Sequence, residues 1–289
     1  MKKVLGYVLV FVAWLSISSA SVMVILSGSS SLVCAFWRLL IATLLIVLYS
    51  ILFEDFNNMF PRDLRTVLLS VVSGVFLATH FLTWMESLFY VPVSLSTTIV
   101  VLYPLVAMLY EVALKISKPR PLEVFGMLTA FSGTVVAVRP YLFGEALYGS
   151  ILAFIGALTG AAYFTIGRVL RKNRVSLTGY VIPCYSASTI TVFTYSMLTN
   201  RSIWPARADS WIYLVLLAVV PMIGGHTVIN YLVKYMKSYV ATVIGFGEAP
   251  GATILASLLL SQKIELNVVV GMVVAVSGAL LTVSLKEVK

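Results

Sequence analysis

Charge is the scarcest property of this sequence. Only 11% of its 289 residues are Asp, Glu, Lys or Arg, whereas 60% are hydrophobic. Water-soluble domains carry about a quarter charged residues, so a chain with this composition and long uncharged runs belongs in a lipid bilayer. The net charge of +9 does not indicate a nucleic-acid partner, because the basic residues lie in short loops between apolar runs.

Groups that carry catalysis or hold metal ions are also scarce. The chain has two histidines and two cysteines, with no HExxH sequence, no cysteine–histidine cluster of metal-ligating spacing and no glycine-rich phosphate loop. Asp55, Asp63 and Asp209 all lie in predicted loops, which excludes an aspartyl protease acting within the membrane. Cys34 and Cys184 fall near opposite membrane faces, too far apart for a disulfide. We expect no enzyme, no cofactor and no bound metal.

Ten apolar runs follow one another, each close to the roughly 20 residues that a bilayer-spanning helix needs. They cover 4–26, 32–53, 66–90, 92–114, 122–138, 147–167, 177–198, 211–233, 238–261 and 266–285. Transmembrane strands would be about half as long and would alternate with period two. The sequence therefore predicts an all-α membrane protein with ten transmembrane helices.

The positions of the basic residues predict its orientation. With the N-terminus in the cytoplasm, fifteen of the twenty lysines and arginines fall on the cytoplasmic side and four in outer loops, while Arg38 lies within the second span. We expect a multi-pass protein of the plasma or cytoplasmic membrane with both termini in the cytoplasm.

A set of landmarks occurs twice along the chain. The shared residues are His80, Pro104, Gly126 and Gly133 in the first half and His226, Pro250, Gly271 and Gly278 in the second. The His–Pro pairs are offset by 146 residues and the glycine pairs by 145. Each copy holds five spans, so the second copy enters the membrane in the opposite orientation. We predict two inverted five-helix repeats, 1–142 and 143–289, an arrangement common in secondary transporters with a midplane substrate site.

Glu248 is the sharpest candidate for a functional group. It lies about ten residues into the ninth span, roughly 15 Å deep at 1.5 Å per residue, where a carboxyl group needs a reason. Pro250 removes a backbone donor and frees backbone groups of the preceding turn, and Gly247 and Gly251 open the backbone to close approach. We interpret Glu248 as a proton or substrate site. The alternative is a structural hydrogen bond to His226 or to the backbone.

His80 and His226 occupy equivalent positions of the predicted repeats, and each shares a helix face with a residue four positions later, Trp84 and Asn230. Three amphipathic aromatic residues, Trp14, Tyr103 and Tyr163, also lie at mid-depth, away from the interfaces where such residues usually gather. Helix packing is the alternative for each. The predicted substrate-binding residues are Trp14, His80, Trp84, Tyr103, Tyr163, His226, Asn230 and Glu248.

Two other charged positions receive a structural interpretation. Arg38, about six residues inside the outer end of the second span, would extend to the outer interface or pair with Glu86. Glu111 and Lys115, one turn apart at the cytoplasmic end of the fourth span, would form a surface pair.

Taken in order, these residues resemble the drug/metabolite transporter superfamily, specifically its ten-helix EamA-type members. The similarity covers nearly the whole chain. The matching positions are Trp14 in the first helix, Ala35-Phe-Trp-Arg38 in the second, Pro104 in the fourth, Gly126 and Gly133 in the fifth, Gly225-His226-Thr227 with Asn230 in the eighth, and Glu248 with Pro250 in the ninth. Two positions depart, because Ser117 and Gln262 stand where the family has a glutamate nine residues before a glycine.

The resemblance implies a secondary transporter that moves a small metabolite, such as an amino acid or related compound, most often outward, by alternating access. Its cavity would be lined by helices one, three, four, six, eight and nine. No nucleotide-binding motif is present, so gradients would supply the energy, with protons as the candidate coupling ion. The sequence indicates no oligomeric state.

Three other functions remain open. A cation exporter of the small-multidrug-resistance type would carry a glutamate in its first helix, but 4–26 contains no acidic residue. A passive channel would need a continuous polar file or charged ring, whereas the polar groups here cluster at mid-depth. A scaffold would move no metabolite.

Overall fold

The computed structural model describes residues 3–54, 59, 61, 63–138 and 144–282, and throughout these the regular elements are helices. Asp55 and the expected repeat boundary at 142/143 lie outside the described residues. The ten spans are α1 (Lys3–Ser18) with α2 (Ala20–Leu26), α3 (Ser31–Phe53), α4 (Leu64–Ser87), α5 (Val93–Val100) with α6 (Tyr103–Ala113), α7 (Pro121–Val138), α8 (Glu145–Lys172), α9 (Leu177–Thr199), α10 (Ser210–Leu217) with the π-helix η3 (Ala218–Thr227) and α11 (Val228–Leu232), α12 (Ser238–Thr242) with α13 (Ile244–Leu260), and α14 (Leu266–Thr282).

The predicted all-α, ten-helix membrane class is confirmed. Seven spans are long and apolar enough to cross a bilayer, and α7 and α14 supply shorter apolar helices. The remaining span, α9, is 23 residues long. The largest boundary error is at the end of α8, which continues from the predicted residue 167 to Lys172. Its last turn carries Arg171 and Lys172, and cations are favourable at a helix C-terminus.

Side-chain caps set the beginnings of several spans. Asp63 accepts a hydrogen bond from the Thr66 backbone N–H at 2.9 Å, and Ser176 accepts one from Gly179 at 2.9 Å, which satisfies amide groups that the first helical turn leaves unpaired. The bonds from Thr66 hold the pKa of the Asp63 carboxyl below its ordinary value. Asp209 precedes α10 but does not cap it through its side chain, which forms an ion pair with Arg207 instead.

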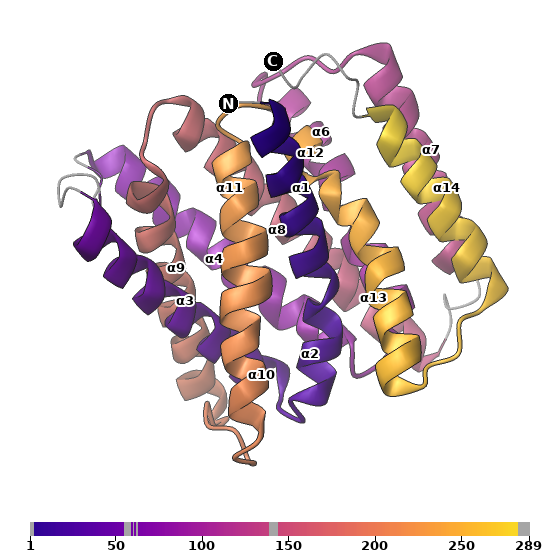
Figure 1. Ribbon diagram of the computed structural model, residues 1–289, viewed down its shortest axis with the longest axis horizontal. Coiled ribbons are helices and arrows are strands. Elements are labelled where there is room, and N and C mark those ends of the chain that lie inside the picture. Colours follow the sequence, from indigo (N-terminus) through magenta and orange to yellow (C-terminus); the bar gives the residue numbers. More distant parts are fainter. Residues whose placement is uncertain (1–2, 55–58, 60, 62, 139–143, 283–289) are drawn as a thin grey trace.

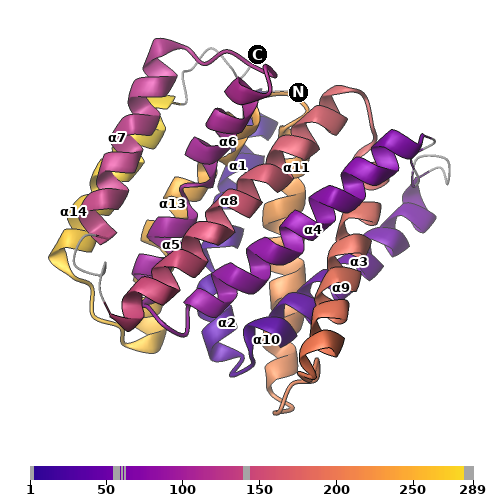
Figure 2. The same cartoon turned by 180° about the vertical axis from the view of Figure 1, so that it is seen from behind.

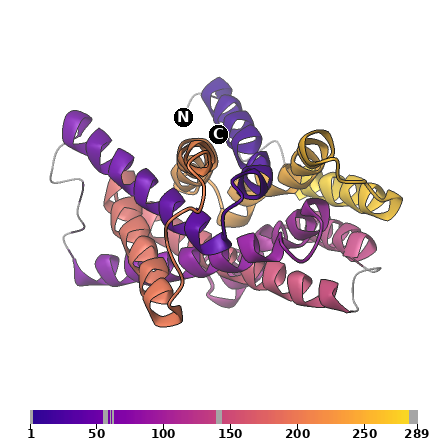
Figure 3. The same cartoon turned by 90° about the horizontal axis from the view of Figure 1, so that it is seen from below.

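The spans form an elongated bundle with α7 and α14 paired at one edge and α3 and α9 toward the other (Figures 1 and 2). The view from below shows the same division (Figure 3). We call the side at which α1 begins and α14 ends the terminal side. Because successive spans alternate in direction, α7, α9 and α12 also begin there, whereas α5 and α14 begin on the opposite side.

Most of the extensive helix contacts join α1–α7 to α8–α14. They include α7 with α14, α3 with α9, α4 with α8, α1 with η3, α6 with α8, α1 with α13, α4 with α9 and α3 with η3. In an exchange of the halves, each of the first five spans takes the place of the span five positions later, and the reverse. Under this exchange the α4–α8 contact corresponds to α1–η3, α6–α8 to α1–α13, and α4–α9 to α3–η3. The contact pattern therefore repeats when the halves are exchanged.

An aromatic cluster covers the start of α3 on the side opposite the terminal side. The Trp37 indole N–H donates to the Ile203 carbonyl at 2.8 Å, and its ring centroid lies 4.5 Å from that of Trp211 and 5.2 Å from that of Trp204. These contacts hold the loop between α9 and α10 against α3. Tryptophan is typical of the membrane–water interface.

Candidate functional site

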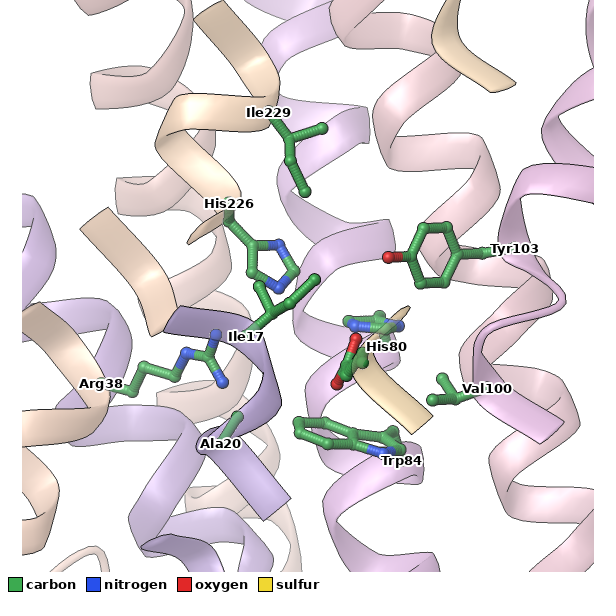
Figure 4. A pocket seen from close by; sticks show the side chains of 10 residues that line it. Ile17, Ala20, Arg38, His80, Trp84, Val100, Tyr103, His226 and Ile229 are labelled. Atoms are coloured by element: carbon green, nitrogen blue, oxygen red, sulfur yellow. The ribbon is translucent and has the colours of Figure 1, made fainter. Parts of the chain in front are cut away.

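A polar cavity lies inside the bundle between helices of both halves (Figure 4). The lining residues are Ile17, Ala20, Arg38, His80, Trp84, Val100, Tyr103, His226, Ile229 and Glu248. Nine of these ten are buried and His226 is half-buried. The cavity volume is about 10 Å³, which is room for about one water molecule.

Two spans of the first half are interrupted where they reach this cavity. The first breaks between α1 and α2, and Ala20, which begins α2, lines the cavity. The fourth breaks between Val100, the last residue of α5, and Tyr103, the first of α6, and both line the cavity. Interrupted helices expose backbone groups at the depth where secondary transporters bind their substrates.

The eighth span reaches the cavity through the π-helix η3, which contains Pro221. A Cβ atom added at Gly224 would lie 2.7 Å from Ser16 Oγ, so this glycine lets α1 approach closely. His226 is the penultimate residue of η3, and its ring extends into the cavity (Figure 4). Short π-segments often occur at functional sites.

The ninth span contributes Glu248 from α13, with Pro250 inside the same helix. A Cβ atom at Gly247 would lie 2.5 Å from Trp14 Cδ1, so the Trp14 indole packs on α13 rather than lining the cavity. Within the described residues no hydrogen bond joins Glu248 to His226, whose Nδ1 has no partner. The structural hydrogen bond considered for Glu248 is therefore not formed with His226.

Arg38 belongs to the cavity, and its interpretation from sequence is wrong. Its side chain is 1% exposed, its guanidinium carbon lies 4.1 Å from the Phe81 ring centroid, and it shares the cavity with Glu248. Glu86 accepts instead from Ser31, at 2.6 Å. The Nε and Nη1 groups of Arg38 have no hydrogen-bond partner among the described residues, and each such buried donor costs roughly 1–3 kcal/mol.

The two histidines meet across the cavity. Their ring centroids are 5.8 Å apart, and the His80 ring stacks on Trp84 at 13°. His80 Nδ1 donates to the Gly156 carbonyl at 2.7 Å, which leaves Nε2 as the acceptor of the neutral ring. A Cβ atom at Gly160 would lie 2.8 Å from His80 Nδ1, so the α8 glycines provide the space that the histidine occupies.

Tyr163 and Asn230 do not line the cavity but belong to a buried network behind His226. The Asn230 side-chain amide donates to the Tyr163 hydroxyl. The Tyr163 and Tyr185 hydroxyls are 3.4 Å apart, and Tyr185 is 3.0 Å from Thr227 Oγ1. Because the Tyr163 ring lies 6.1 Å from that of His226, this network supports the histidine from behind.

Two caps join the halves on opposite sides of the bundle. On the terminal side, Glu111 Oε1 accepts from the backbone N–H of Ser238 at 2.7 Å and from its hydroxyl at 2.5 Å. On the opposite side, Gln262 Oε1 accepts from the backbone N–H of Val93 at 3.1 Å. Ser238 begins α12 and Val93 begins α5. Each cap therefore holds the first turn of an interrupted span from the other half.

The terminal-side cap is reinforced by charge. The Glu123 carboxylate accepts from Arg120 at 3.0 Å, from Lys237 at 3.0 Å and from the Tyr239 hydroxyl at 3.0 Å. Glu111 itself is fully buried, so its predicted surface pair with a lysine one turn away is wrong.

Sequence reasoning thus found five of the ten lining residues and missed Arg38 together with four apolar ones. Only Arg38 carried a usable signal, because a lone charge within a span is by default a functional candidate. The apolar lining residues do not differ in type from their lipid-facing neighbours.

These features define a helical membrane protein with an enclosed polar site where broken helices meet. The family model described as "EamA-like transporter family" matches residues 4–139 and again 147–284. This chain belongs to the EamA-like transporter family. The family resemblance stated from sequence is confirmed.

Two individual proteins are similar to this chain. An uncharacterized transporter of Clostridium kluyveri is 28% identical over 174 residues, a match that covers 58% of this chain and 56% of the relative; the chain thus spans little more than half the length of that protein. A protein crystal structure superposes on this chain with a TM-score of 0.76 at 18% identity, covering 98% of both chains, and this similarity shows the fold alone.

Proposed function

We propose that this chain is a secondary transporter that carries a small metabolite, such as an amino acid or a related compound, out of the cell by alternating access. The main support is the buried polar cavity with room for about one water molecule. Binding sites for small molecules usually measure about 300–1,000 Å³. A metabolite therefore fits only after the surrounding helices separate, which favours a carrier over a permanently open pore.

The caps provide the matching gates. Separating α6 from α12 would break the bonds of Glu111 to Ser238 and open the terminal side. Separating α5 from the end of α13 would break the bond of Gln262 to Val93 and open the other side. Basic residues predominate in the loops of the terminal side, so we assign that side to the cytoplasm of the cell membrane. The outward direction rests on the family resemblance.

Two related, inverted halves would explain the contact pattern. Gly133 of α7 packs against Gly271 of α14, and Gly126 packs against Gly278, so the glycines that recur in the sequence also pair in space. The helix contacts repeat when the halves are exchanged. Both observations support a pseudo-twofold arrangement, in which the gates exchange roles during transport.

Glu248, His80 and His226 are the groups we assign to proton coupling, because all three are titratable and face the same cavity. The small-multidrug-resistance alternative places its glutamate in the first helix, whereas the cavity carboxylate here comes from α13. The passive-channel alternative predicts conductance that does not saturate with substrate.

The test begins with a comparison of extracellular metabolites from expressing and non-expressing cells. Each enriched compound is then measured in proteoliposomes containing the purified chain, as counterflow against the unlabelled compound. Counterflow supports the carrier proposal, because a channel does not support exchange against a gradient. If no compound is enriched and none of the free amino acids shows counterflow, the proposal is wrong.

A further inference from the structure

We infer that Arg38 holds a carboxylate of the transported compound, and that Glu248 is the internal counterion that this carboxylate displaces. The inference rests on the proposed transport function and names the chemical group that its site selects. Arg38 lies in the cavity, it is buried, and two of its N–H groups, Nε and Nη1, are unpaired among the described residues.

The geometry around Arg38 prepares it for a planar oxyanion. Phe81 covers one face of the guanidinium, with the guanidinium carbon 4.1 Å from the ring centroid. Stacking of this kind fixes the plane of the group but leaves its in-plane N–H donors available. Figure 4 shows the side chain extending from α3 toward the centre of the pocket. Nη1–H and Nη2–H at the end of the guanidinium form the fork that binds a carboxylate in bidentate fashion, and Nε–H on another edge can donate one further hydrogen bond to an entering oxyanion.

Other partners do not account for these donors. Neither histidine of the cavity accepts a hydrogen bond from Nε or Nη1 of Arg38 among the described residues. The space holds about one water molecule, and one water cannot satisfy both donors and Glu248 together. The unpaired donors point to a ligand that enters when the cavity opens.

Glu248 explains how the empty site remains neutral. Its carboxyl group lines the same cavity as Arg38, with no direct ion pair between the two among the described residues. When ionised, it offsets the charge of Arg38 where hydrocarbon would penalise an isolated cation. A cation that enters would meet Arg38 and be repelled, whereas a carboxylate would compete with Glu248 for the guanidinium. The site therefore selects against purely cationic compounds, the cargo of the small-multidrug-resistance alternative.

A buried arginine elsewhere in the fold provides a matched control. Arg171 of α8 is 3% exposed, and it donates through Nε to the Asn230 carbonyl at 3.3 Å and through Nη1 to the Val175 carbonyl at 2.6 Å. Its donors are satisfied by backbone outside the cavity. Arg171→Lys should therefore lower stability without changing which ligands bind.

The experiment measures thermal unfolding of the purified full-length protein with each of the twenty free amino acids, their methyl esters and their N-acetyl derivatives, since a ligand that binds the folded state raises the unfolding temperature. We expect at least one free acid to stabilise the wild-type protein and its methyl ester to stabilise at least about 10-fold more weakly in apparent affinity, a difference of about 1.4 kcal/mol. Arg38→Gln should abolish this acid–ester difference, Arg38→Lys should reduce it, and Arg171→Lys should leave it unchanged.

The N-acetyl amino acids carry a carboxylate but no cationic amino group. Glu248 should therefore weaken their binding, and its removal should strengthen it. Glu248→Gln removes the competing counterion and should tighten their binding, whereas a purely structural Glu248 predicts weaker binding or none. The acid–ester comparison uses the wild-type chain and does not depend on the folding of any variant. The inference is overturned if esters bind as well as acids, if no acid stabilises the protein, or if Arg38→Gln retains the preference. Counterflow of a compound that lacks an anionic group would refute the role of Arg38 while supporting the proposed transport.

Discussion

Gly133 of α7 and Gly271 of α14 touch backbone to backbone, since a Cβ atom on Gly271 would lie 2.5 Å from the Gly133 carbonyl oxygen. In lipid no hydrophobic force drives helices together, so close approach through glycines supplies the packing. These two helices lie at the edge of the bundle (Figure 1), where this contact and that of Gly126 with Gly278 join them.

The first prediction follows from that contact. Gly271→Ala should lower the free energy of unfolding by about 1–3 kcal/mol, the usual cost of overpacking, because the added methyl group meets backbone that cannot rotate away. Thermal unfolding in detergent measures the effect. Val273→Ala on the same helix is the control, since Val273 is 62% exposed and its truncation should change little. Equal stability of the two variants would contradict the contact.

The second prediction concerns topology. From sequence, Ser29 and Ser210 would be labelling sites on the outer side, but both are buried. Ser202, in the exposed loop after α9, replaces them, and Asn173, exposed after α8, reports the terminal side. In a cysteine-free background, Ser202→Cys should react with an impermeant thiol reagent in intact cells and Asn173→Cys only after lysis. The reverse pattern would invert the proposed orientation.

The third prediction is that Glu248→Gln keeps the protein folded and inserted but removes the dependence of transport on pH. Glutamine preserves the shape of the side chain but cannot exchange a proton. Counterflow in proteoliposomes over a range of pH, normalised to the amount of inserted protein, measures the effect. A variant with wild-type transport at every pH would reduce Glu248 to a structural role.

The fourth prediction tests the two gates. Spin labels at Phe89 and Ile212 report distances across the outer ends of α4 and α10. At the terminal side, labels at Leu68 and Tyr235 are suitable because both are exposed, whereas Val233, the natural choice from sequence, is fully buried. Alternating access requires one distance to lengthen as the other shortens when substrate is added.

Removing a cap should change the populations of the two states that these spin-label distances report. Loss of a helix cap costs about 0.5–2 kcal/mol, which corresponds to a population change of roughly 2- to 30-fold. Glu111→Ala should therefore favour the state open on the terminal side, and Gln262→Ala the state open on the other. If both variants shift the distances in the same direction, the caps are not opposing gates.

The sequence predicted the ten spans because each is a long apolar run, a signal that survives any detail of packing. It did not predict where spans break. Pro104 follows the break between α5 and α6, and Pro221 lies within η3, but the breaks at Ser19 and Val243 carry no proline, and α13 continues past Pro250 without interruption. These breaks depend on contacts with other helices.

The site was predicted where residue type alone was decisive. Glu248 and the two histidines stand out because titratable groups are rare within spans. Arg38 was misassigned because the prediction measured its depth along α3 and assumed that water reaches the start of this helix. In the structure the first turns of α3 are buried, including Leu32 and Cys34, so protein blocks the route by which the side chain would reach the interface. Residues distant in sequence pack on this part of α3, such as Trp211, whose ring contacts that of Trp37.

The near absence of free space in the cavity has a further consequence for a carrier of the kind proposed. A binding site that collapses around its own charges when empty brings almost no solvent with it on the return stroke. With Glu248 ionised, the charge of Arg38 would be offset within the cavity, and no further ion would need to accompany it. The unloaded protein would therefore leak little across the membrane, and the gradient would be used mainly on strokes that carry cargo.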